Sequence, residues 1–478
     1  MSSTINRDKV LASFYQYGVA CNIRLVNGSS SAGVTGAESV PDITLQGTSD
    51  PVSFYVETGS GLRVMVVERV YDDVTYEQKP CFITIYDPKD WSIKVARANY
   101  KYKDGTDLLN VYSAVTSIGA VGLGYIYGAD YSGTNVANPQ GRIFMMEYTK
   151  TGSVETLTIK THYQFTPTTK ARAYSVGTVL VAEGTNNYVF AIAQQYTTTG
   201  SGYDPGDYDY GDSILAKLDY KTLEEVATTA VAPNAFSIQT SGIANDSDLY
   251  ITSIGGAQWY GDGSGGIKWN VGSRIQMVKA ADMTVKDLVR PANADEAGDY
   301  PDDCFDIRAV AFCDDAAKTT YILTGSYAAD YKLTGRLWKT TLADLKGADD
   351  DLISSIASSG YPTVTVNAKG ALWVLLPCDG ATVWGFAEAT SDGYAGLGIY
   401  NANRRVGELK SAKELSTLGA PSFSQLAVVL APEATRGVGA AAPASIASAR
   451  GYVHPVFASG AGLKPEERAK FIKAHFGK

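Results

Sequence analysis

Apolar residues alternate with polar or small residues in short runs along most of the chain. The clearest case is residues 274–288, RIQMVKAADMTVKDL, where two alternating runs flank a polar turn. Alternation at period two predicts β-strands, and two such runs around a turn predict a hairpin. Similar pairs of runs begin at Phe82, Ile143, Ile214, Leu337 and, more weakly, Gly396.

The pairs recur at a nearly constant spacing. Positions 82, 143, 214, 275, 337 and 396 are separated by 61, 71, 61, 62 and 59 residues. A constant period predicts one supersecondary unit repeated several times. Two further runs precede a pair, as in residues 236–244 and 249–254, so each unit contains four strands. The runs in neighbouring units are 171–184 and 188–193, 305–313 and 319–325, and 362–370 and 371–376. Four antiparallel strands at this period predict an all-β fold, a β-propeller of four-stranded blades.

Six such units fill residues 48–413, and the two ends of the chain carry further strand patterns. These are VACNIRLV (19–26), DITL (42–45, as an outer strand) and APSFSQLAVVLA (420–431, as a first strand). They favour a seventh blade built jointly by both termini, which closes the ring and removes exposed sheet edges. Six blades with a capping strand is the alternative.

The chain divides into a propeller, residues 1–437, and an extension, residues 438–478, that is rich in Gly, Ala, Ser and Pro. A short helix is expected at 463–476, with Pro465 at its start and Glu466 and Glu467 in its first turn. Whether this helix docks on the propeller, docks on a partner or frays is left open.

Composition narrows the class of partner. The net charge of −9 and the absence of a Lys/Arg block argue against nucleic acid. No apolar run is long enough to span a membrane. The first residues lack the apolar stretch of a signal peptide. The 48 Gly and 31 Tyr resemble the composition of exported bacterial β-proteins. We therefore expect an extracytoplasmic or cell-surface protein whose export signal has been removed, with a cytoplasmic protein as the alternative.

Cysteine and histidine are sparse. The five cysteines, Cys21, Cys81, Cys304, Cys313 and Cys378, form no CxxC pair, so neither a zinc site nor a disulfide framework is encoded. Cys81 and Cys378 are expected to fill the core, and a Cys304–Cys313 pair is left open. Only His162, His454 and His475 occur. This leaves little material for a histidine-based triad or metal site.

Candidate binding residues lie in loops expected at one face of the propeller. There the second-to-third-strand loops and the loops between blades surround the mouth of the central channel. The spacing of 71 residues between positions 143 and 214 is about ten residues longer than the others. The extra residues fall in one such loop, residues 197–212. A neighbouring loop contains GDGSGG (261–266), which is expected to be flexible. The candidates are Tyr203, Asp204, Asp207, Tyr208, Asp209, Tyr210, Asp212, Trp259, Tyr260, Asp262, Trp269, Tyr300, Asp302 and Asp303.

Three kinds of chemistry fit this pattern. Aromatic rings beside carboxylates suit a glycan or protein ligand. Asp204, Asp207, Asp209 and Asp212 could collect Ca²⁺, although their spacing is not that of an EF-hand. Two carboxylates could serve as general acid and base. The structural alternative is that Asp and Gly form turns while Tyr packs the loops together.

Two segments carry a resemblance to a known family. LYITSIGG (249–256) and KGALWVLL (369–376) resemble the blade cores of bacterial seven-bladed propellers of the surface-layer and quinoprotein-like kind. The resemblance covers residues 50–410. It implies the propeller fold, and it carries over no residue of a quinone or lactonase calcium site.

These observations favour a non-enzymatic propeller that is exported or at the cell surface. It would bind an unknown protein or glycan through the Tyr/Asp-rich loops, without an assigned catalytic residue or cofactor. The first alternative is a carbohydrate- or lactone-directed hydrolase or lyase with carboxylates, and Ca²⁺ as a candidate ion, at the channel mouth. The second is a structural module of a surface assembly.

Overall fold

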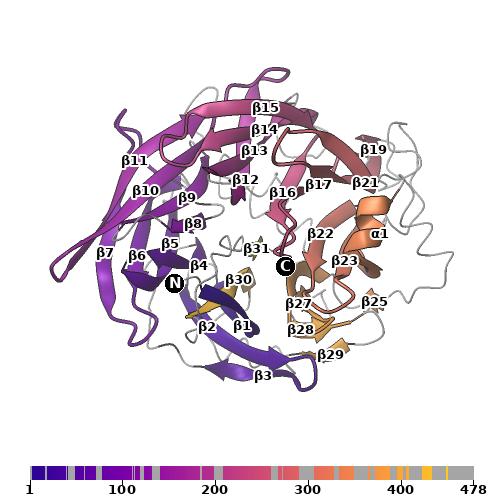
Figure 1. The fold of residues 1–478 in the computed structure, drawn as a ribbon, viewed down its shortest axis with the longest axis horizontal. Coiled ribbons are helices and arrows are strands. Elements are labelled where there is room, and N and C mark those ends of the chain that lie inside the picture. Colours follow the sequence, from indigo (N-terminus) through magenta and orange to yellow (C-terminus); the bar gives the residue numbers. More distant parts are fainter. Residues whose placement is uncertain are drawn as a thin grey trace.

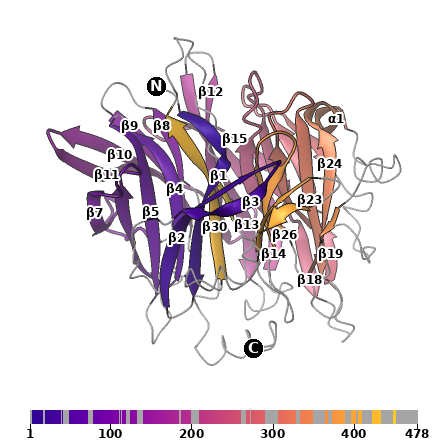
Figure 2. The same ribbon diagram turned by 90° about the horizontal axis from the view of Figure 1, so that it is seen from below.

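Four-stranded antiparallel sheets follow one another along the chain in the computed structural model. It describes residues 3–16, 19–38, 40, 49–58, 60–71, 78–109, 111, 114–118, 123–131, 140–183, 186–198, 208–259, 267–271, 273–289, 306–327, 333–348, 364–366, 372–387, 396–401, 405–408, 422–432 and 448–450. Figure 1 shows the sheets arranged around a common centre, and Figure 2 shows the ring from the side. This is the all-β propeller architecture that the repeat predicts.

Six of the sheets are built from consecutive segments. The first contains β4 (Ser49–Thr58), β5 (Gly61–Tyr71), β6 (Gln78–Tyr86) and β7 (Ile93–Asn99), and the second contains β8 (Ala114–Ile118), β9 (Leu123–Tyr131), β10 (Gly141–Thr151) and β11 (Val154–Gln164). The third contains β12 (Arg172–Glu183), β13 (Asn186–Thr198), β14 (Tyr208–Asp219) and β15 (Glu225–Val231), and the fourth contains β16 (Ala235–Thr240), β17 (Leu249–Ser253), β20 (Arg274–Val278) and β21 (Val285–Val289). The fifth contains β22 (Asp306–Phe312), β23 (Thr319–Tyr327), β24 (Leu333–Thr341) and β25 (Val364–Val366), and the sixth contains β26 (Leu372–Pro377), β27 (Val383–Ala387), β28 (Gly396–Tyr400) and β29 (Arg405–Glu408).

One further sheet joins the two ends of the chain. Its order is β3 (Gly33–Glu38), β2 (Val19–Ser29), β1 (Ser3–Gln16), β30 (Ser422–Pro432) and β31 (Ser448–Arg450). β30 pairs antiparallel with β1 from Ser3↔Pro432 to Tyr15↔Ser422. The outer strand is β3, whereas DITL (42–45) lies outside the described residues. The count of seven blades and the closure of the ring stay predictions from the repeat, as does the helix at 463–476, which also lies outside the described residues.

The two ends of the ring differ in which strands they connect. At one end, here called the loop face, the second strand of each sheet leads into the third and the fourth strand leads into the next sheet. The opposite end, the turn face, carries the turns between first and second strands and between third and fourth strands. The hairpin β18 (Gly256–Trp259) and β19 (Ile267–Val271) extends from the loop face, and α1 (Leu342–Gly347) lies at the turn face (Figure 2).

The repeated polar turn has a specific backbone geometry at the turn face. Trp91, Leu223 and Met283 each adopt a positive φ, near 56–61°, at the same place between third and fourth strands. Left-handed backbone is unfavourable for a residue with a β-carbon. In two of these turns the side chain is buried between sheets: Leu223 is 3% exposed and Met283 8%. Their burial offsets the backbone cost, which explains why a large apolar residue recurs where Gly is usual.

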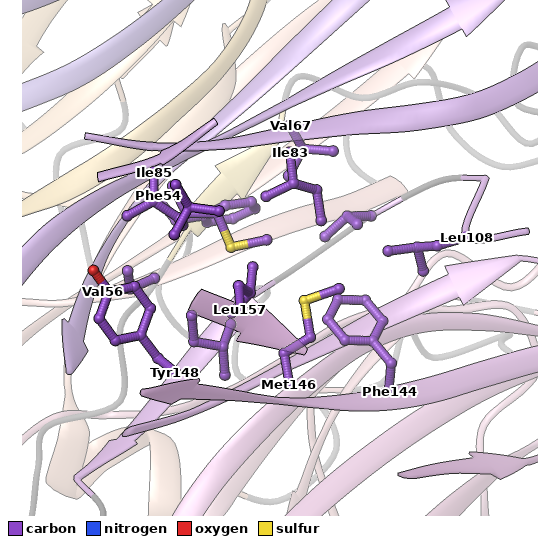
Figure 3. Close-up of a cluster of buried hydrophobic side chains, with 14 of the residues drawn as sticks. Phe54, Val56, Val67, Ile83, Ile85, Leu108, Phe144, Met146, Tyr148 and Leu157 are labelled. Carbon is purple, nitrogen blue, oxygen red and sulfur yellow. The ribbon is translucent and has the colours of Figure 1, made fainter. Parts of the chain in front are cut away.

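The core lies between neighbouring sheets. Between β4–β7 and β8–β11, the apolar side chains of Phe54, Ile83 and Ile85 face those of Phe144 and Met146 (Figure 3). Cys81 lies in the same core and Cys378 is also buried, as expected. Among the described cysteines, Cys81, Cys313 and Cys378 are all free thiols. Since each sheet buries both faces against its neighbours, a single repeat could not form this core alone.

The fifth unit departs from the expected strand pattern in two places. The pair of runs that begins at Leu337 was expected to form two strands, but its second half forms α1. Thr341 caps this helix by accepting a hydrogen bond from the Asp344 N–H at 3.1 Å. The outer strand is therefore displaced to β25. The prediction that 362–370 and 371–376 form the first two strands of a unit is wrong: β25 completes the fifth sheet and β26 opens the sixth.

Hydroxyl groups at the loop face join consecutive sheets. Ser273, at the start of β20, accepts a hydrogen bond from the Ile307 N–H at 2.8 Å and donates to the Ser253 carbonyl at 2.6 Å. Ser213 accepts from the Ala235 N–H at 3.0 Å in the same way. In both cases the third strand of one sheet holds the first strand of the next.

Ser273→Ala is expected to destabilise the fold by about 1–3 kcal/mol, because it leaves the buried Ile307 N–H without its acceptor. Chemical denaturation followed by far-UV circular dichroism measures the change. Ser273→Thr keeps the hydroxyl and is the matched control. A Ser273→Ala variant as stable as the wild type would show that this hydrogen bond contributes nothing.

Candidate functional site

The loop between β7 and β8 covers the loop-face end of sheet β8–β11. Its turn is Asp104-Gly105-Thr106, in which Gly105 has φ +84° and the Tyr102 N–H donates to the Thr106 carbonyl at 2.9 Å. Asp104 Oδ1 accepts hydrogen bonds from Thr106 N–H at 2.9 Å and from its hydroxyl at 2.6 Å. Asp and Gly favour this turn because the carboxylate can bond the backbone and Gly adopts positive φ. The turn places Tyr102 over the end of the sheet.

Five side chains gather beneath this turn and are called here the Arg142 cluster: Tyr102, Asp104, Asp130, Arg142 and His162. They come from the β7–β8 loop, the end of β9, the start of β10 and the end of β11. The Tyr102 hydroxyl donates to Asp130 Oδ2 at 2.9 Å. The guanidinium of Arg142 lies 4.7 Å from the Tyr102 ring centroid, and the His162 ring contacts the same ring edge-on at 4.7 Å.

Arg142 is held firmly but not completely satisfied. Its side chain is 9% exposed, and Nη2 lies 3.1 Å from Asp104 Oδ2. Nη1 donates to the Thr106 hydroxyl. Nε is buried and has no hydrogen-bond partner among the described residues. A buried donor without a partner is costly, so an oxygen that reached this group would relieve that cost.

The charges of the cluster follow from these contacts. Hydrogen bonds from the Thr106 hydroxyl and N–H lower the pKa of Asp104, so this carboxyl is ionised at neutral pH. Burial, followed by the charge of Arg142, lowers the pKa of His162, so its imidazole is neutral at pH 7. Burial and the Asp130 carboxylate raise the pKa of Tyr102 well above its usual value, which keeps the phenol protonated. The cluster thus combines a neutral imidazole, an accessible carboxylate and a guanidinium.

The candidate residues between 203 and 212 are partly described. Tyr208, Asp209, Tyr210 and Asp212 belong to β14 rather than to a loop, because β14 pairs with β13 as far as Thr198↔Tyr208. Asp209 Oδ2 forms an ion pair with Lys170 Nζ at 2.6 Å and is 52% exposed. The Tyr210 ring packs against Tyr196 with centroids 6.0 Å apart. Tyr203, Asp204 and Asp207 lie outside the described residues.

The candidate tryptophans lie on a β-ribbon that the sequence does not predict. The segment around GDGSGG was expected to be a loop, yet residues on both sides of it pair as β18 and β19. Trp259 pairs with Ile267, and Trp269 pairs with Ala257. β18 contacts β14, so the structure brings together candidate segments from two consecutive sheets. Tyr260, Asp262, Tyr300, Asp302 and Asp303 lie outside the described residues.

The calcium hypothesis stays a prediction, since Asp204 and Asp207 are among the residues not described. Within the described part of the chain, no three His, Cys, Asp or Glu side chains gather as a metal site. No helix of the described chain is long and apolar enough to cross a membrane.

The sequence analysis missed most of the Arg142 cluster. Of these five residues, only His162 was named there, as one of the three histidines. The signal was the turn sequence Asp104-Gly105-Thr106 in a connection between units, together with Arg142 at the start of a third strand. Asp104 and Arg142 are 38 residues apart, and only the fold brings them into contact.

Comparison with known proteins gives structural likeness only. No family model matches the chain, and no curated protein matches it. Similar solved structures include a Trypanosoma rangeli sialidase in complex with the inhibitor DANA (TM-score 0.36, 10% identity, covering 81% of this chain and 58% of that chain). A Mycobacterium tuberculosis puromycin-hydrolyzing peptidase has TM-score 0.37, 13% identity and coverage of 91% and 62%. A Hadza microbial sialidase has TM-score 0.37, 10% identity and coverage of 78% and 72%.

The chain spans less than two thirds of the length of the first two of these proteins. This comparison contradicts the expectation of a non-enzymatic binding propeller. The similar structures are mainly sialidases, together with a peptidase and an exo-β-1,3-galactanase. The first alternative given above, a carbohydrate- or lactone-directed hydrolase or lyase, remains a proposal.

Proposed function

We propose that this protein is an enzyme that cleaves a C–O bond in a carbohydrate or lactone, by hydrolysis or elimination, at the loop face. The observation that carries the proposal is the Arg142 cluster. It holds a neutral imidazole, an ionised carboxylate and a guanidinium with an unpartnered N–H around one buried tyrosine. These are the groups that acid–base catalysis on such a bond requires.

Each group has a distinct role in this proposal. In hydrolysis, His162 accepts a proton from water as the water oxygen forms the new bond to carbon. The C–O bond then breaks, and the departing oxygen takes the proton that His162 has accepted, which restores the neutral imidazole. The positive charge of the Arg142 guanidinium stabilises an oxygen that gains negative charge in the transition state. Asp104 holds Arg142 in place, and Asp130 holds Tyr102, on which both His162 and Arg142 rest.

The substrate would extend over the aromatic side chains of the same face. Tyr210 lies at the end of sheet β12–β15, next to the β18–β19 ribbon, and its ring packs against the buried Tyr196. Tyrosine rings suit sugar surfaces because they offer apolar area with few rotatable bonds. The candidate partner is therefore a glycan. Among the candidate binding residues predicted from the sequence, the described residues Tyr210 and Asp209 would contact it, together with neighbouring candidates.

The location of the protein is part of the proposal. An extracytoplasmic or cell-surface site of action rests on the Gly- and Tyr-rich composition. The likeness to surface-layer and quinoprotein-like propellers stays a prediction from the strand pattern, and it assigns no chemistry. The role as a module of a surface assembly also stays a prediction.

A screen of purified protein against aryl glycosides, polysaccharides and lactones tests the function. Glycoside hydrolysis is measured by the release of reducing ends, and elimination by the absorbance of unsaturated products. Lactone hydrolysis is measured by the release of acid. Asp104→Asn is expected to lower the cleavage rate about tenfold or more, because it loosens Arg142. No cleavage of any of these substrates by the wild type would overturn the proposal.

Asp90→Asn is the matched control for Asp104→Asn. Asp90 Oδ1 accepts from the Ser92 N–H at 2.9 Å and hydroxyl at 2.6 Å, which is the same local turn geometry as at Asp104. Asp90 lies at the turn face, far from Arg142 in the chain and on the opposite end of the ring. Equal rate losses in both variants would mean that the Asp104 effect reflects turn stability and not the cluster.

A further inference from the structure

β31 gives one sheet a fifth strand, on the side of the central channel. The sheet order β3-β2-β1-β30-β31 places β30 in the position that the first strand occupies in the other sheets, with β31 beyond it. In Figure 1, β31 lies near the centre of the ring. Among the described strands, none of the other six sheets has a strand added to its first strand.

β31 lies beside the loop-face half of β30. First strands run from the loop face to the turn face, so Ser422 marks the loop-face end of β30. β31 pairs with its first half, through Gln425↔Arg450, Leu426↔Ala449 and Ala427↔Ser448. β31 also contacts β26, the first strand of the sixth sheet. It therefore lies in the loop-face half of the ring, in contact with both β30 and β26.

The inner edge of a first strand exposes backbone N–H and C=O groups that can pair with another extended chain. Addition of a strand to such an edge is a common mode of peptide recognition, with affinity from backbone hydrogen bonds. β31 has the sequence Ser-Ala-Arg, so two of its three residues are small. Small residues suit this position, because first strands from several sheets converge on the channel.

We propose that the inner edge of β30 is a strand-addition site for an extended peptide and that the segment carrying β31 is its resident occupant. Three pairs of described residues hold β31 to β30, and the proposal is that a separate peptide of the same sequence can take its place. This proposal rests on strand pairing and holds whether or not the protein is an enzyme.

Ala449→Pro in the full-length chain tests the proposal. Proline removes the N–H of Ala449 and is disfavoured inside a paired strand. We expect the amides of residues 425–427 to exchange with deuterium at least about tenfold faster in this variant than in the wild type. Ala441→Pro, in the same Ala-rich stretch but before the paired residues, is the control and should leave this exchange unchanged.

A labelled peptide of residues 445–452, SIASARGY, provides the second readout. Fluorescence anisotropy should detect its binding to the Ala449→Pro protein and not to the wild type, whose edge is occupied. Binding to the wild type with equal affinity would show a free edge and overturn the proposal. Unchanged exchange at 425–427 together with no peptide binding to the variant would do the same. If Ala449→Pro does not fold, the double variant Ser448→Gly/Ala449→Gly replaces it with the same expected directions.

Discussion

Replacing Arg63 with Met is expected to destabilise the protein by about 3–5 kcal/mol, the cost of breaking a buried ion pair from one side. Arg63 on β5 donates to both carboxylate oxygens of Glu155 on β11, through Nε at 3.0 Å and Nη2 at 2.8 Å. The two side chains are 7% and 4% exposed. Without Arg63, the Glu155 carboxylate would remain buried, with Lys150 at 3.6 Å as its nearest cation among the described residues.

The loss is expected to be large because the pair joins two sheets. Tyr148, whose ring belongs to the core in Figure 3, donates its hydroxyl to Glu155, and Arg63 Nε also donates to this hydroxyl at 3.3 Å. One substitution therefore disturbs three buried polar groups at the junction of sheets β4–β7 and β8–β11. Polar networks of this kind lose more than one pairwise contact when a member is removed.

Urea denaturation of two further variants separates the charge effect from packing. Arg63→Met/Glu155→Gln removes both charges and keeps an acceptor for Tyr148, so it should recover most of the stability lost in Arg63→Met. Lys160→Met breaks an exposed pair with Glu147 (46% and 17% exposed) and should cost no more than about 1 kcal/mol. If Arg63→Met proved as stable as Lys160→Met, the buried ion pair would not have a dominant role in stability.

Most of the fold could be predicted because its determinants are local and repeated. Residues 274–288 contain a third strand, its turn and a fourth strand, and the structure has β20 and β21 there. The turn depends on neighbours in sequence, as the hydrogen bond from the Met283 N–H to the Lys279 carbonyl at 2.9 Å shows. Apolar alternation then sets which residues enter the core.

The errors arose where a local signal competed with the repeat. Thr341 and Asp344 form a helix cap within a segment that the period assigns to a strand, and the cap prevailed. The displaced outer strand then shifted the assignment of the following residues, 362–376, by one position in the unit. A capping signal of this kind is readable from sequence, but the regularity of the spacing concealed it.

The candidate site could be predicted only in part, because its contacts span different units. Tyr102 and Asp130 are 28 residues apart, and Tyr102 comes from a connection that the repeat treats as a spacer. Aromatic and acidic composition directed attention to the loop face. It could not indicate that Asp209 pairs with Lys170, or that Arg142 keeps a buried N–H without a partner among the described residues.

His162 is expected to titrate below its usual pKa of 6.5 in the folded protein, because burial and the charge of Arg142 disfavour the imidazolium. NMR of the imidazole protons measures this directly and needs no substrate. Comparison with His162→Gln assigns the signal among the three histidines. Arg142→Met should raise the pKa of His162 by removing a positive charge, whereas Asp104→Asn should lower it by removing a negative one.

If His162 is the general base, His162→Gln and His162→Phe should each lower kcat by about 10²–10⁴. The phenylalanine keeps a ring against Tyr102 but cannot accept a proton, so equal losses in both variants separate base chemistry from packing. The wild-type rate should be constant above the pKa of His162 and should fall as pH drops below it, since only the neutral imidazole accepts a proton. The acid limb of the profile should then move upward in Arg142→Met and downward in Asp104→Asn, by the same amounts as the pKa measured by NMR. An acid limb that stays in place while the pKa of His162 moves would assign the base to another group.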